Sequence, residues 1–233
     1  MKRILIVEDE TAIREFEAIN LKRVGYDITE AGSGEEALEI YDNDFEGFDI
    51  ALLDISMPGM DGFTLCKELR KRSQTLGIIM LTARTQEMDK ISGLMLGADD
   101  YITKPFNPLE LVARVKSQIR RYTQLGNLGQ QNNSQVYKCG GLMINDDTKD
   151  VTVDGDPIKL TPIEFEILYL LASNPGRVFS TDEIFEKVWN EKVYEANNTV
   201  MVHIRRLRGK MKEDSRQNKI ITTVWGVGYK IEK

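Results

Sequence analysis

Short apolar runs alternate with longer helical patterns throughout the first half of the chain. Five short runs have strand character, at 4–7, 28–31, 50–53, 78–83 and 101–103. Helical patterns lie between them, for example at 12–24, where the apolar residues are Ile13, Phe16, Ile19 and Leu21. Such alternation builds βαβ units, so the sequence predicts an α/β domain with a doubly wound, five-stranded parallel sheet.

The second half follows a different pattern. Residues 122–135 are poor in apolar side chains and rich in Gln, Asn and Gly, which is typical of a flexible linker. Short strand patterns follow within 136–160, and then come helical patterns at 162–173, 181–189 and 197–213 and strand patterns at 220–224 and 227–231. This order predicts a smaller α+β winged-helix domain. The expected organisation is a first domain at 1–121, a linker at 122–135 and a second domain at 136–233.

The charge is divided unevenly between the two halves. The net charge of -6 falls on residues 1–130, whereas residues 131–233 carry equal numbers of acidic and basic side chains. Within 201–230, however, eight basic side chains stand against two acidic ones. An acidic half and a half with a concentrated basic segment indicate that the two halves have different functions.

Composition argues against several classes of protein. No apolar run approaches the roughly 18 residues of a membrane span, and the run after Met1 is too short for a secretory signal. We therefore expect a cytoplasmic protein with no membrane contact. His203 is the only histidine, which argues against a Ser-His-Asp hydrolase or a multi-histidine metal site. Cys66 and Cys139 lack metal-ligand spacing and are expected to be free thiols.

Polar residues stand at the ends of four predicted strands. They are Glu8 and Asp9 after the first run, Asp54 after the third, Thr82 at the end of the fourth and Lys104 after the fifth. The carboxyl ends of parallel strands meet at one edge of a sheet, so we expect these side chains to converge. Close carboxylates repel one another unless a cation lies among them, and oxygen ligands without His or Cys favour Mg²⁺. Lys104 and Thr82 suit a phosphoryl group, which Asp54 could accept as a nucleophile.

Two simpler interpretations compete with this one. Each of these residues alone would be an ordinary polar side chain at a strand end, and only their occurrence together favours a site. The segment GSGEEA at 32–37 also fits the dinucleotide-binding pattern G-x-G-x-x-G/A. It follows the second predicted strand rather than the first, and Glu35 and Glu36 would repel a pyrophosphate. We therefore interpret it as a turn and an acid-rich helix start.

The motifs around these strand ends resemble those of response-regulator receiver domains over residues 1–121. They are the acidic pair at 8–9, LLDISMPGMDG at 52–62, LTA at 81–83, GADDY at 97–101 and KPF at 104–106. The resemblance implies a flavodoxin-like fold in which Asp54 is the phosphoacceptor. It also implies that Mg²⁺ is held by Glu8, Asp9, Asp54 and the backbone carbonyl of Ser56.

The same resemblance implies roles for three further residues. Thr82 and Tyr101 match the switch pair of the family, and Lys104 matches the lysine that contacts the phosphoryl group, with a cis bond to Pro105. At Ser56 this branch of the family usually carries a bulkier apolar side chain. A small hydroxyl residue at that position bears on the lifetime of the phosphoryl group.

The helical pattern at 197–212 is basic. Its apolar stripe consists of Val200, Ile204, Leu207 and Met211, and the other faces would, taken alone, equally fit a solvated basic helix. TVMVHIRRLR at 199–208 and TVWGVGYK at 223–230 nevertheless resemble the winged-helix effector domain of the OmpR/PhoB family, including a VanR-like subgroup. LTPIEF at 160–165 matches the start of the first helix of that domain.

Carried over by position, this second resemblance implies a set of DNA contacts. Thr199, Val202 and Arg206 would face bases, and His203, Arg205 and Arg208 would face phosphates. Lys230, in the closing hairpin, could hold a phosphate or enter a minor groove. The resemblance further implies a dimer of receiver domains, with pairs across a two-fold axis between Lys90 and Glu110, Asp100 and Arg114, and Asp99 and Arg120.

We therefore expect a transcription regulator that accepts a phosphoryl group on Asp54 from a partner histidine kinase, dimerises through the receiver and binds repeated DNA half-sites. RNA polymerase is a further candidate partner. An enzyme of the aspartate-nucleophile phosphatase class is the main alternative, but Ser56 cannot supply the second acid that such enzymes favour two residues after the nucleophile. A receiver that controls a partner protein, with a merely solvated basic helix, is the third. Salt-dependent DNA binding would separate it from our prediction.

Overall fold

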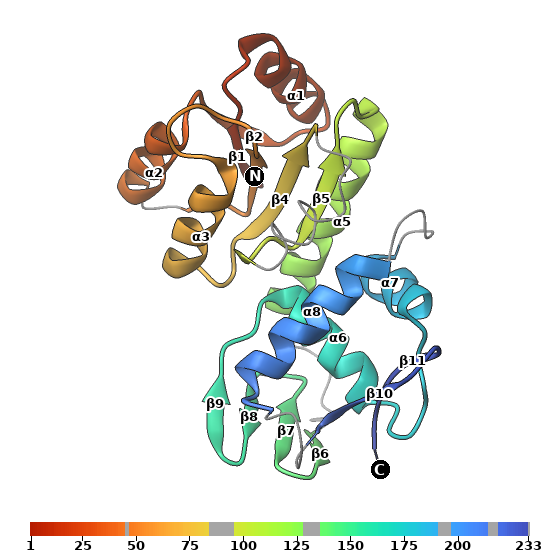
Figure 1. The fold of residues 1–233 in the computed structure, drawn as a ribbon. Coiled ribbons are helices and arrows are strands. Elements are labelled where there is room, and N and C mark those ends of the chain that lie inside the picture. The colour runs from red at the N-terminus through yellow and green to blue at the C-terminus, as the bar shows by residue number, and fades with distance from the viewer. Residues whose placement is uncertain (45–46, 84–95, 128–135, 191–196, 214–218, 233) are drawn as a thin grey trace. The chain divides into compact units, whose positions relative to one another are not determined.

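A computed structural model describes residues 1–44, 47–83, 96–127, 136–190, 197–213 and 219–232 (Figure 1). The chain forms two compact units, Met1–Tyr122 and Thr123–Lys233. Among the described helices, none combines the length and the apolar character needed to cross a membrane.

The first unit is built on a five-stranded sheet in the order β2-β1-β3-β4-β5, and all neighbouring strands are parallel. The strands are β1 (Arg3–Val7), β2 (Asp27–Ala31), β3 (Ile50–Asp54), β4 (Gly77–Thr82) and β5 (Asp100–Thr103). Every residue of β3 and β4 is buried, as expected for central strands covered on both faces. The predicted doubly wound sheet is confirmed.

Helices cover both faces of this sheet. Figure 1 shows α1 (Thr11–Arg23) and α5 (Pro108–Asn127) on one face, and α2 (Gly34–Asn43) and α3 (Gly62–Arg72) on the other. Because side chains alternate along a strand, the odd and even positions of each strand serve different helix layers. The layer under α1 and α5 joins strand residues such as Ile4, Ile6 and Leu52 to Ala18, Leu21, Leu111, Val115 and Ile119 of the helices.

The helix α1 is confirmed, but its apolar residues do not all face the core. Phe16 and Ile19 are 41% and 60% exposed, whereas Glu17, Ala18 and Leu21 are buried. At about 100° per residue, positions 17, 18 and 21 share one side of a helix, and positions 16 and 19 lie on the other. The helix therefore places a carboxyl group in the core of the first unit.

The helix α5 extends into the predicted linker. It continues to Asn127, so residues 122–127 are helical, and the linker as a whole stays a prediction. They include no proline, and Gly126 alone among them is a poor helix former, so the backbone can carry the helix onward. The rest of the predicted linker, 128–135, lies outside the described residues.

The second unit opens with a four-stranded antiparallel sheet and continues with three helices and a hairpin. The strands are β6 (Val136–Cys139), β7 (Leu142–Asn145), β8 (Val151–Val153) and β9 (Asp156–Ile158). The helices are α6 (Pro162–Ala172), α7 (Thr181–Trp189) and α8 (Asn197–Lys210), and the hairpin is β10 (Ile221–Val224) with β11 (Gly228–Ile231). This is the predicted winged-helix order, although α8 ends at Lys210 rather than near 213.

The helices α6 and α7 begin in the same way. Thr161 caps α6 and Ser180 caps α7, and in each case a glutamate in the first turn completes a capping box. The hairpin is tied to the segment before α7, because Phe179 and Tyr229 exchange two backbone hydrogen bonds of 2.9 Å. A Cβ at Gly228 would lie 1.9 Å from the carbonyl oxygen of Phe179, so this close approach requires glycine.

Candidate functional site

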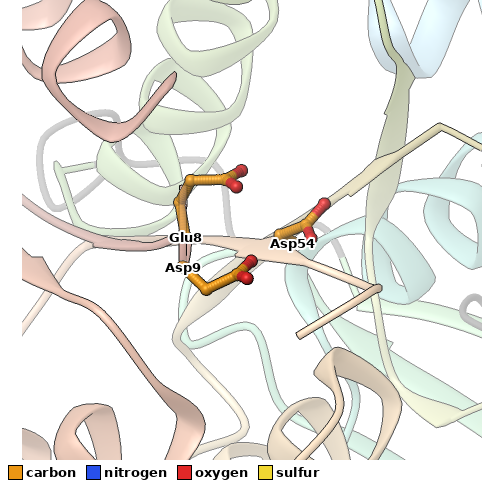
Figure 2. Close-up of side chains that lie close together, drawn as sticks. All are labelled: Glu8, Asp9 and Asp54. Carbon is orange, nitrogen blue, oxygen red and sulfur yellow. The ribbon is translucent and has the colours of Figure 1, made fainter. Parts of the chain in front are cut away.

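Four strand ends meet at one edge of the first sheet. Glu8 follows β1, Asp54 ends β3, Thr82 ends β4 and Lys104 follows β5, and these strands are parallel neighbours. Carboxylate oxygens of Glu8, Asp9 and Asp54 lie within 4.8 Å of one another. Figure 2 shows the three side chains gathered around one space. The structure therefore brings together the three acidic residues that the sequence singled out.

Lys104 lies between two of these carboxylates. Its Nζ is 2.5 Å from Oε2 of Glu8 and 2.8 Å from Oδ1 of Asp54. The other oxygen of Asp54, Oδ2, accepts a hydrogen bond of 3.1 Å from the backbone N–H of Ser56. The bond between Lys104 and Pro105 is cis, as expected. Both oxygens of Asp54 are thus held by a donor.

The turn residues after β3 explain how the chain leaves this site. A Cβ at Gly62 would lie 2.1 Å from the backbone oxygen of Asp54, so the chain can return behind Asp54 only with glycine there. Asp61 then starts α3 as its N-cap, accepting a hydrogen bond of 2.8 Å from the N–H of Thr64. The apolar run of β3 ends on the carboxylate of Asp54 because the strand reaches the edge of the sheet at that residue. Asp61 and Gly62 then turn the chain directly into α3.

The electrostatics of the pocket favour a further cation. Burial raises the pKa of Glu8, the hydrogen bond from Lys104 opposes that shift, and the charge of Asp54 adds to it. Burial acts to lower the pKa of Lys104, but its hydrogen bonds to Asp54 and Glu8 outweigh burial, and the pKa is raised overall. One ammonium thus faces three carboxylates. A donor set made only of oxygen fits Mg²⁺, and the backbone carbonyl of Ser56 as a further ligand stays a prediction.

A fourth carboxyl near this pocket was missed by sequence reasoning. Glu17 of α1 is fully buried, and neither of its side-chain oxygens has a hydrogen-bond partner among the described residues. Burial raises its pKa to about 8, with the charges of Glu8 and Asp54 adding to the shift and Lys104 opposing it. The carboxyl group therefore largely keeps its proton at neutral pH. The angular position of residue 17 on α1 is the signal that could have found it.

The predicted switch residues lie on the neighbouring strands. Thr82 is fully buried at the end of β4, and Tyr101 is half-buried in β5. In the register of these strands, Met80 is paired with Tyr101 and Thr82 with Thr103. The two side chains therefore belong to adjacent strands near the pocket edge, and their coupled movement stays a prediction.

The basic residues of α8 differ sharply in their surroundings. Arg205 is exposed. Arg206 forms an ion pair of 2.9 Å with Glu164 of α6, and its side chain is 10% exposed. Nη2 of Arg208 donates hydrogen bonds of 2.8 Å to the carbonyl oxygen of Ile221 and to Oγ1 of Thr223, which joins α8 to the hairpin. Arg208, which we predicted to contact a phosphate, thus also has a structural role.

Three other predicted DNA contacts are not exposed. Thr199, Val202 and His203 are buried, and the ring of His203 lies 5.5 Å from that of Trp189. Contact with DNA through them requires that they become accessible. Lys230 of the hairpin pairs with Glu232 at 2.9 Å. The DNA roles of these residues stay predictions.

Comparisons with known proteins agree with both halves of this description. The family described as "Response regulator receiver domain" matches residues 4–116, and "Transcriptional regulatory protein, C terminal" matches 155–231. The regulatory protein VanR of Enterococcus faecium is 45% identical over 232 residues, which cover 99% of each chain. The chain is a two-component response regulator of the OmpR/PhoB type.

Further relatives support this assignment of the response regulator. The transcriptional regulatory protein ResD of Bacillus subtilis is 40% identical over 233 residues, covering 99% of this chain and 95% of that protein. The crystal structure of DrrB, an OmpR/PhoB homologue from Thermotoga maritima, matches with a TM-score of 0.51 and 32% identity over both full chains. The regulator therefore has a receiver and a DNA-binding domain, and it acts in transcription.

The surface predicted to pair two receivers of this response regulator includes an aspartate that already has a partner within the chain. Asp99 is fully buried, and its Oδ2 lies 2.9 Å from Nη2 of Arg70 and accepts the N–H of Ile78 at 2.9 Å. It is part of the internal packing between α3 and the sheet, because a buried carboxylate needs a partner within the fold. A pair between Asp99 and Arg120 of a second copy stays a prediction, and Asp99 would have to leave this internal pair to form it. Arg120 itself is exposed on α5.

The other members of that surface are placed as follows. Arg114 of α5 lies 3.1 Å from Asp100 and 3.2 Å from Glu110 within the same chain. Lys90 lies outside the described residues. A pair between Asp100 and Arg114 of two copies would therefore have to replace a pair that already exists within each chain.

Proposed function

We propose that Asp54 accepts a phosphoryl group from a histidine kinase and that this event controls DNA binding. The observation that carries the proposal is the geometry of Asp54, whose two oxygens are held by Lys104 and by the N–H of Ser56 beside a cluster of carboxylates. A buried carboxylate whose oxygens are held in a fixed orientation can act as a nucleophile. In-line phosphoryl transfer depends mostly on positioning and charge neutralisation.

In the proposed step, a carboxylate oxygen of Asp54 forms a bond to phosphorus. The bond between phosphorus and the histidine nitrogen of the kinase breaks, and that nitrogen keeps the electron pair. Lys104 can leave Glu8 and follow the incoming phosphoryl oxygens, because its ammonium sits on a flexible stem. Thr82, at the end of the next strand, can donate its hydroxyl. Mg²⁺ held by Glu8, Asp9 and Asp54 would neutralise charge on the phosphoryl oxygens.

The test is uptake of labelled phosphoryl groups from acetyl phosphate and from a kinase, with and without Mg²⁺. Asp54→Asn should abolish uptake, since it keeps the shape but removes the nucleophile. Asp61→Asn, in the same loop, is the control, because Asp61 caps α3 and asparagine also serves as an N-cap. Label retained by the Asp54→Asn variant would show that another residue is the acceptor.

We further propose that phosphorylation pairs two receivers through α5 and β5. Support comes from the charged set of Asp100, on the same strand as Tyr101, and Glu110 and Arg114, on the helix α5 that follows this strand in the chain. A phosphoryl group that draws in Thr82 would leave room for Tyr101 to turn inward and would reshape this surface. Two DNA-binding domains brought together in this way could occupy repeated half-sites.

Mixing two charge-reversal variants distinguishes pairing between chains from pairing within a chain. Arg114→Asp and Asp100→Arg each lose their internal pair and should each fail to dimerise with beryllofluoride, which mimics the phosphoryl group. When mixed, each variant presents the charge that the other lacks, so heterodimers should form in sedimentation runs. A mixture that stays monomeric, or single variants that dimerise normally, would exclude this interface.

We propose that α8 and the hairpin bind double-stranded DNA, with Arg206 reading bases and exposed Arg205 contacting phosphates. The support is a helix whose apolar stripe packs in the core while its basic residues gather on other faces. Binding should weaken steeply with salt. Arg206→Ala should lose sequence preference, whereas Arg205→Ala should weaken binding equally on all duplexes.

A further inference from the structure

Glu164 has two structural roles at the start of α6. Its side chain is fully buried, and Oε2 accepts a hydrogen bond of 2.8 Å from the N–H of Thr161, which completes the capping box. The same carboxylate also meets two cations of α8. Arg206 approaches Oε1 at 2.9 Å, and Lys210 approaches Oε2 at 2.6 Å. Burial acts to raise the pKa of Glu164, but Arg206 and Lys210 outweigh it and hold the pKa low.

The second capping box in the domain shows that helix capping does not need these contacts. Glu183 occupies the same position in α7 and accepts the N–H of Ser180 at 3.0 Å. Its ion pair is with Arg177, and both side chains are largely exposed. A capping glutamate can therefore stay at the surface. In α6, by contrast, the capping residue Glu164 is buried and contacts the basic helix α8.

We propose that Glu164 is a positioning residue for DNA recognition, which sets the orientation of Arg206 and keeps Lys210 away from phosphates. The proposal rests on the proposed DNA binding of α8. Arg206 and Lys210 are one turn apart on the helix, so one carboxylate can hold both. Because Glu164 is itself fixed by the cap of α6, it anchors the two longer side chains to a rigid element.

The chemistry of the guanidinium group makes this anchoring useful for specificity. Its five N–H donors form a planar fork, so it can be held at Nη2 and still present other donors to an acceptor. A fork in the correct plane can bind O6 and N7 of guanine, and holding it there before binding avoids the loss of rotamer freedom on contact. Lys210 has no such fork and adds only sequence-independent attraction.

The experiment compares Glu164→Gln with Glu183→Gln in the full-length protein. Both changes remove the charge of a capping glutamate and leave an amide oxygen for the cap. The probes are a duplex selected by the wild-type protein from a random pool and a random duplex, each titrated over a range of salt. For Glu164→Gln we expect the ratio of the two affinities to fall about tenfold, within the range of one altered base contact. The salt slope on random DNA should steepen by about one, since Lys210 becomes free to contact a phosphate.

Glu183→Gln should leave both the affinity ratio and the salt slope at wild-type values. If Glu164→Gln also leaves the affinity ratio and the salt slope at wild-type values and changes only thermal stability, Glu164 is a purely structural cap. In a background of Arg206→Ala, Glu164→Gln should have no further effect on the ratio, and an undiminished second loss would also overturn the proposal.

Two further measurements keep the outcome decisive. If Glu164→Gln does not fold, Glu164→Asp retains the charge but is too short to reach both cations, and an unchanged affinity ratio in that variant would equally reject the positioning role. Wild-type protein that shows no preference for any selected duplex would instead refute DNA recognition by α8, and it would do so before any variant is made.

Discussion

Each domain contains a small cluster of close charges beside its proposed binding surface, and the two clusters are opposite in sign. In the receiver, the ammonium of Lys104 lies between Glu8 and Asp54, with Asp9 nearby. In the DNA-binding domain, the carboxylate of Glu164 lies between Arg206 and Lys210. The first cluster has negative charge in excess and the second has positive charge in excess. Each excess matches the proposed ligand, a metal cation in one case and the phosphates of DNA in the other.

The central ion of each cluster differs in mobility. Lys104 carries its charge on a flexible stem and can change partners when a phosphoryl group arrives. Glu164 is short, fully buried and bonded to the backbone of its own helix cap, so it stays where it is. The receiver cluster is thus suited to rearrangement, and the cluster on α8 is suited to holding a fixed arrangement. The following predictions test this contrast, beginning with the two largest effects.

Lys104→Met should destabilise the receiver strongly in the absence of metal. Removal of one partner from a buried ion cluster costs about 3–5 kcal/mol, because the remaining charges lie unpaired. Mg²⁺ should restore much of this loss and should bind the variant more tightly than the wild type, since the competing ammonium is gone. Thermal unfolding across a Mg²⁺ titration measures both effects. Lys67→Met, on the exposed side of α3, is the control.

Equal stabilisation of the wild type and the Lys104→Met variant by Mg²⁺ would contradict the prediction. It would mean that Lys104 does not compete for the metal-binding carboxylates, and the idea of a rearranging cluster would fail.

Glu17 should make receiver stability depend on pH. Its pKa is raised to about 8 in the folded chain from an ordinary value of 4.5. The folded state therefore holds this proton more tightly, so the contribution is fully present below pH 4.5, declines as the pH rises toward 8 and is flat above that. At about 1.4 kcal/mol per pH unit, the decline is on the order of 4–5 kcal/mol.

Glu17→Leu should remove that decline and stabilise the receiver at pH 8, as urea unfolding at several pH values can show. Glu15→Leu, on the exposed side of α1, should leave the pH dependence unchanged. The result would sharpen the contrast between the domains, because Glu17 is kept protonated by burial whereas Glu164 is kept ionised by two cations. If the free energy of unfolding of Glu17→Leu still declines between pH 5 and pH 8, the decline must come from other titratable groups.

The receiver pocket could be predicted from sequence because topology alone brings its residues together. Glu8, Asp54 and Lys104 stand at the ends of strands, and adjacent parallel strands end at one edge of the sheet whatever the details of packing. The parallel sheet and the order of elements in the second unit followed from the same kind of pattern. Contacts that depend on helix orientation did not.

Glu164, Glu17 and Asp99 illustrate the limit. Which residue of α8 meets α6 depends on how the two helices rotate against each other, so Arg206 looked like one exposed arginine among several. Asp99 and Asp100 are the same residue type at neighbouring positions, yet the first pairs with Arg70 and the second with Arg114. A charge in a sequence does not reveal whether its partner lies within the chain.

Arg208→Met should have a moderate effect that separates the two roles of arginine on α8. The variant loses the hydrogen bonds to Ile221 and Thr223, which hold the hairpin against the helix. We expect a loss of about 1–3 kcal/mol in stability, because the carbonyl oxygen of Ile221 and the hydroxyl oxygen of Thr223 lose their donor. Arg205→Met, one turn away on the exposed side, should weaken DNA binding without changing the melting temperature. Equal stability of both variants would mean that Arg208 does not fix the hairpin.

Gly209→Ala should have the smallest effect, a gain of about 0.5–1 kcal/mol in the stability of the DNA-binding domain. Gly209 lies inside α8, and a Cβ built there would meet no other atom within 4 Å, so alanine fits without strain. Alanine raises helix stability relative to glycine, partly because the unfolded chain loses freedom. The change carries no charge and lies between the positions of Arg208 and Lys210, so it should leave the salt slope of DNA binding unaltered. Chemical unfolding and a salt titration measure the two quantities separately. If the salt slope of DNA binding changes in Gly209→Ala, the stability of α8 also governs how its basic side chains contact DNA. The ion pairs with Glu164 would then not be the sole determinant.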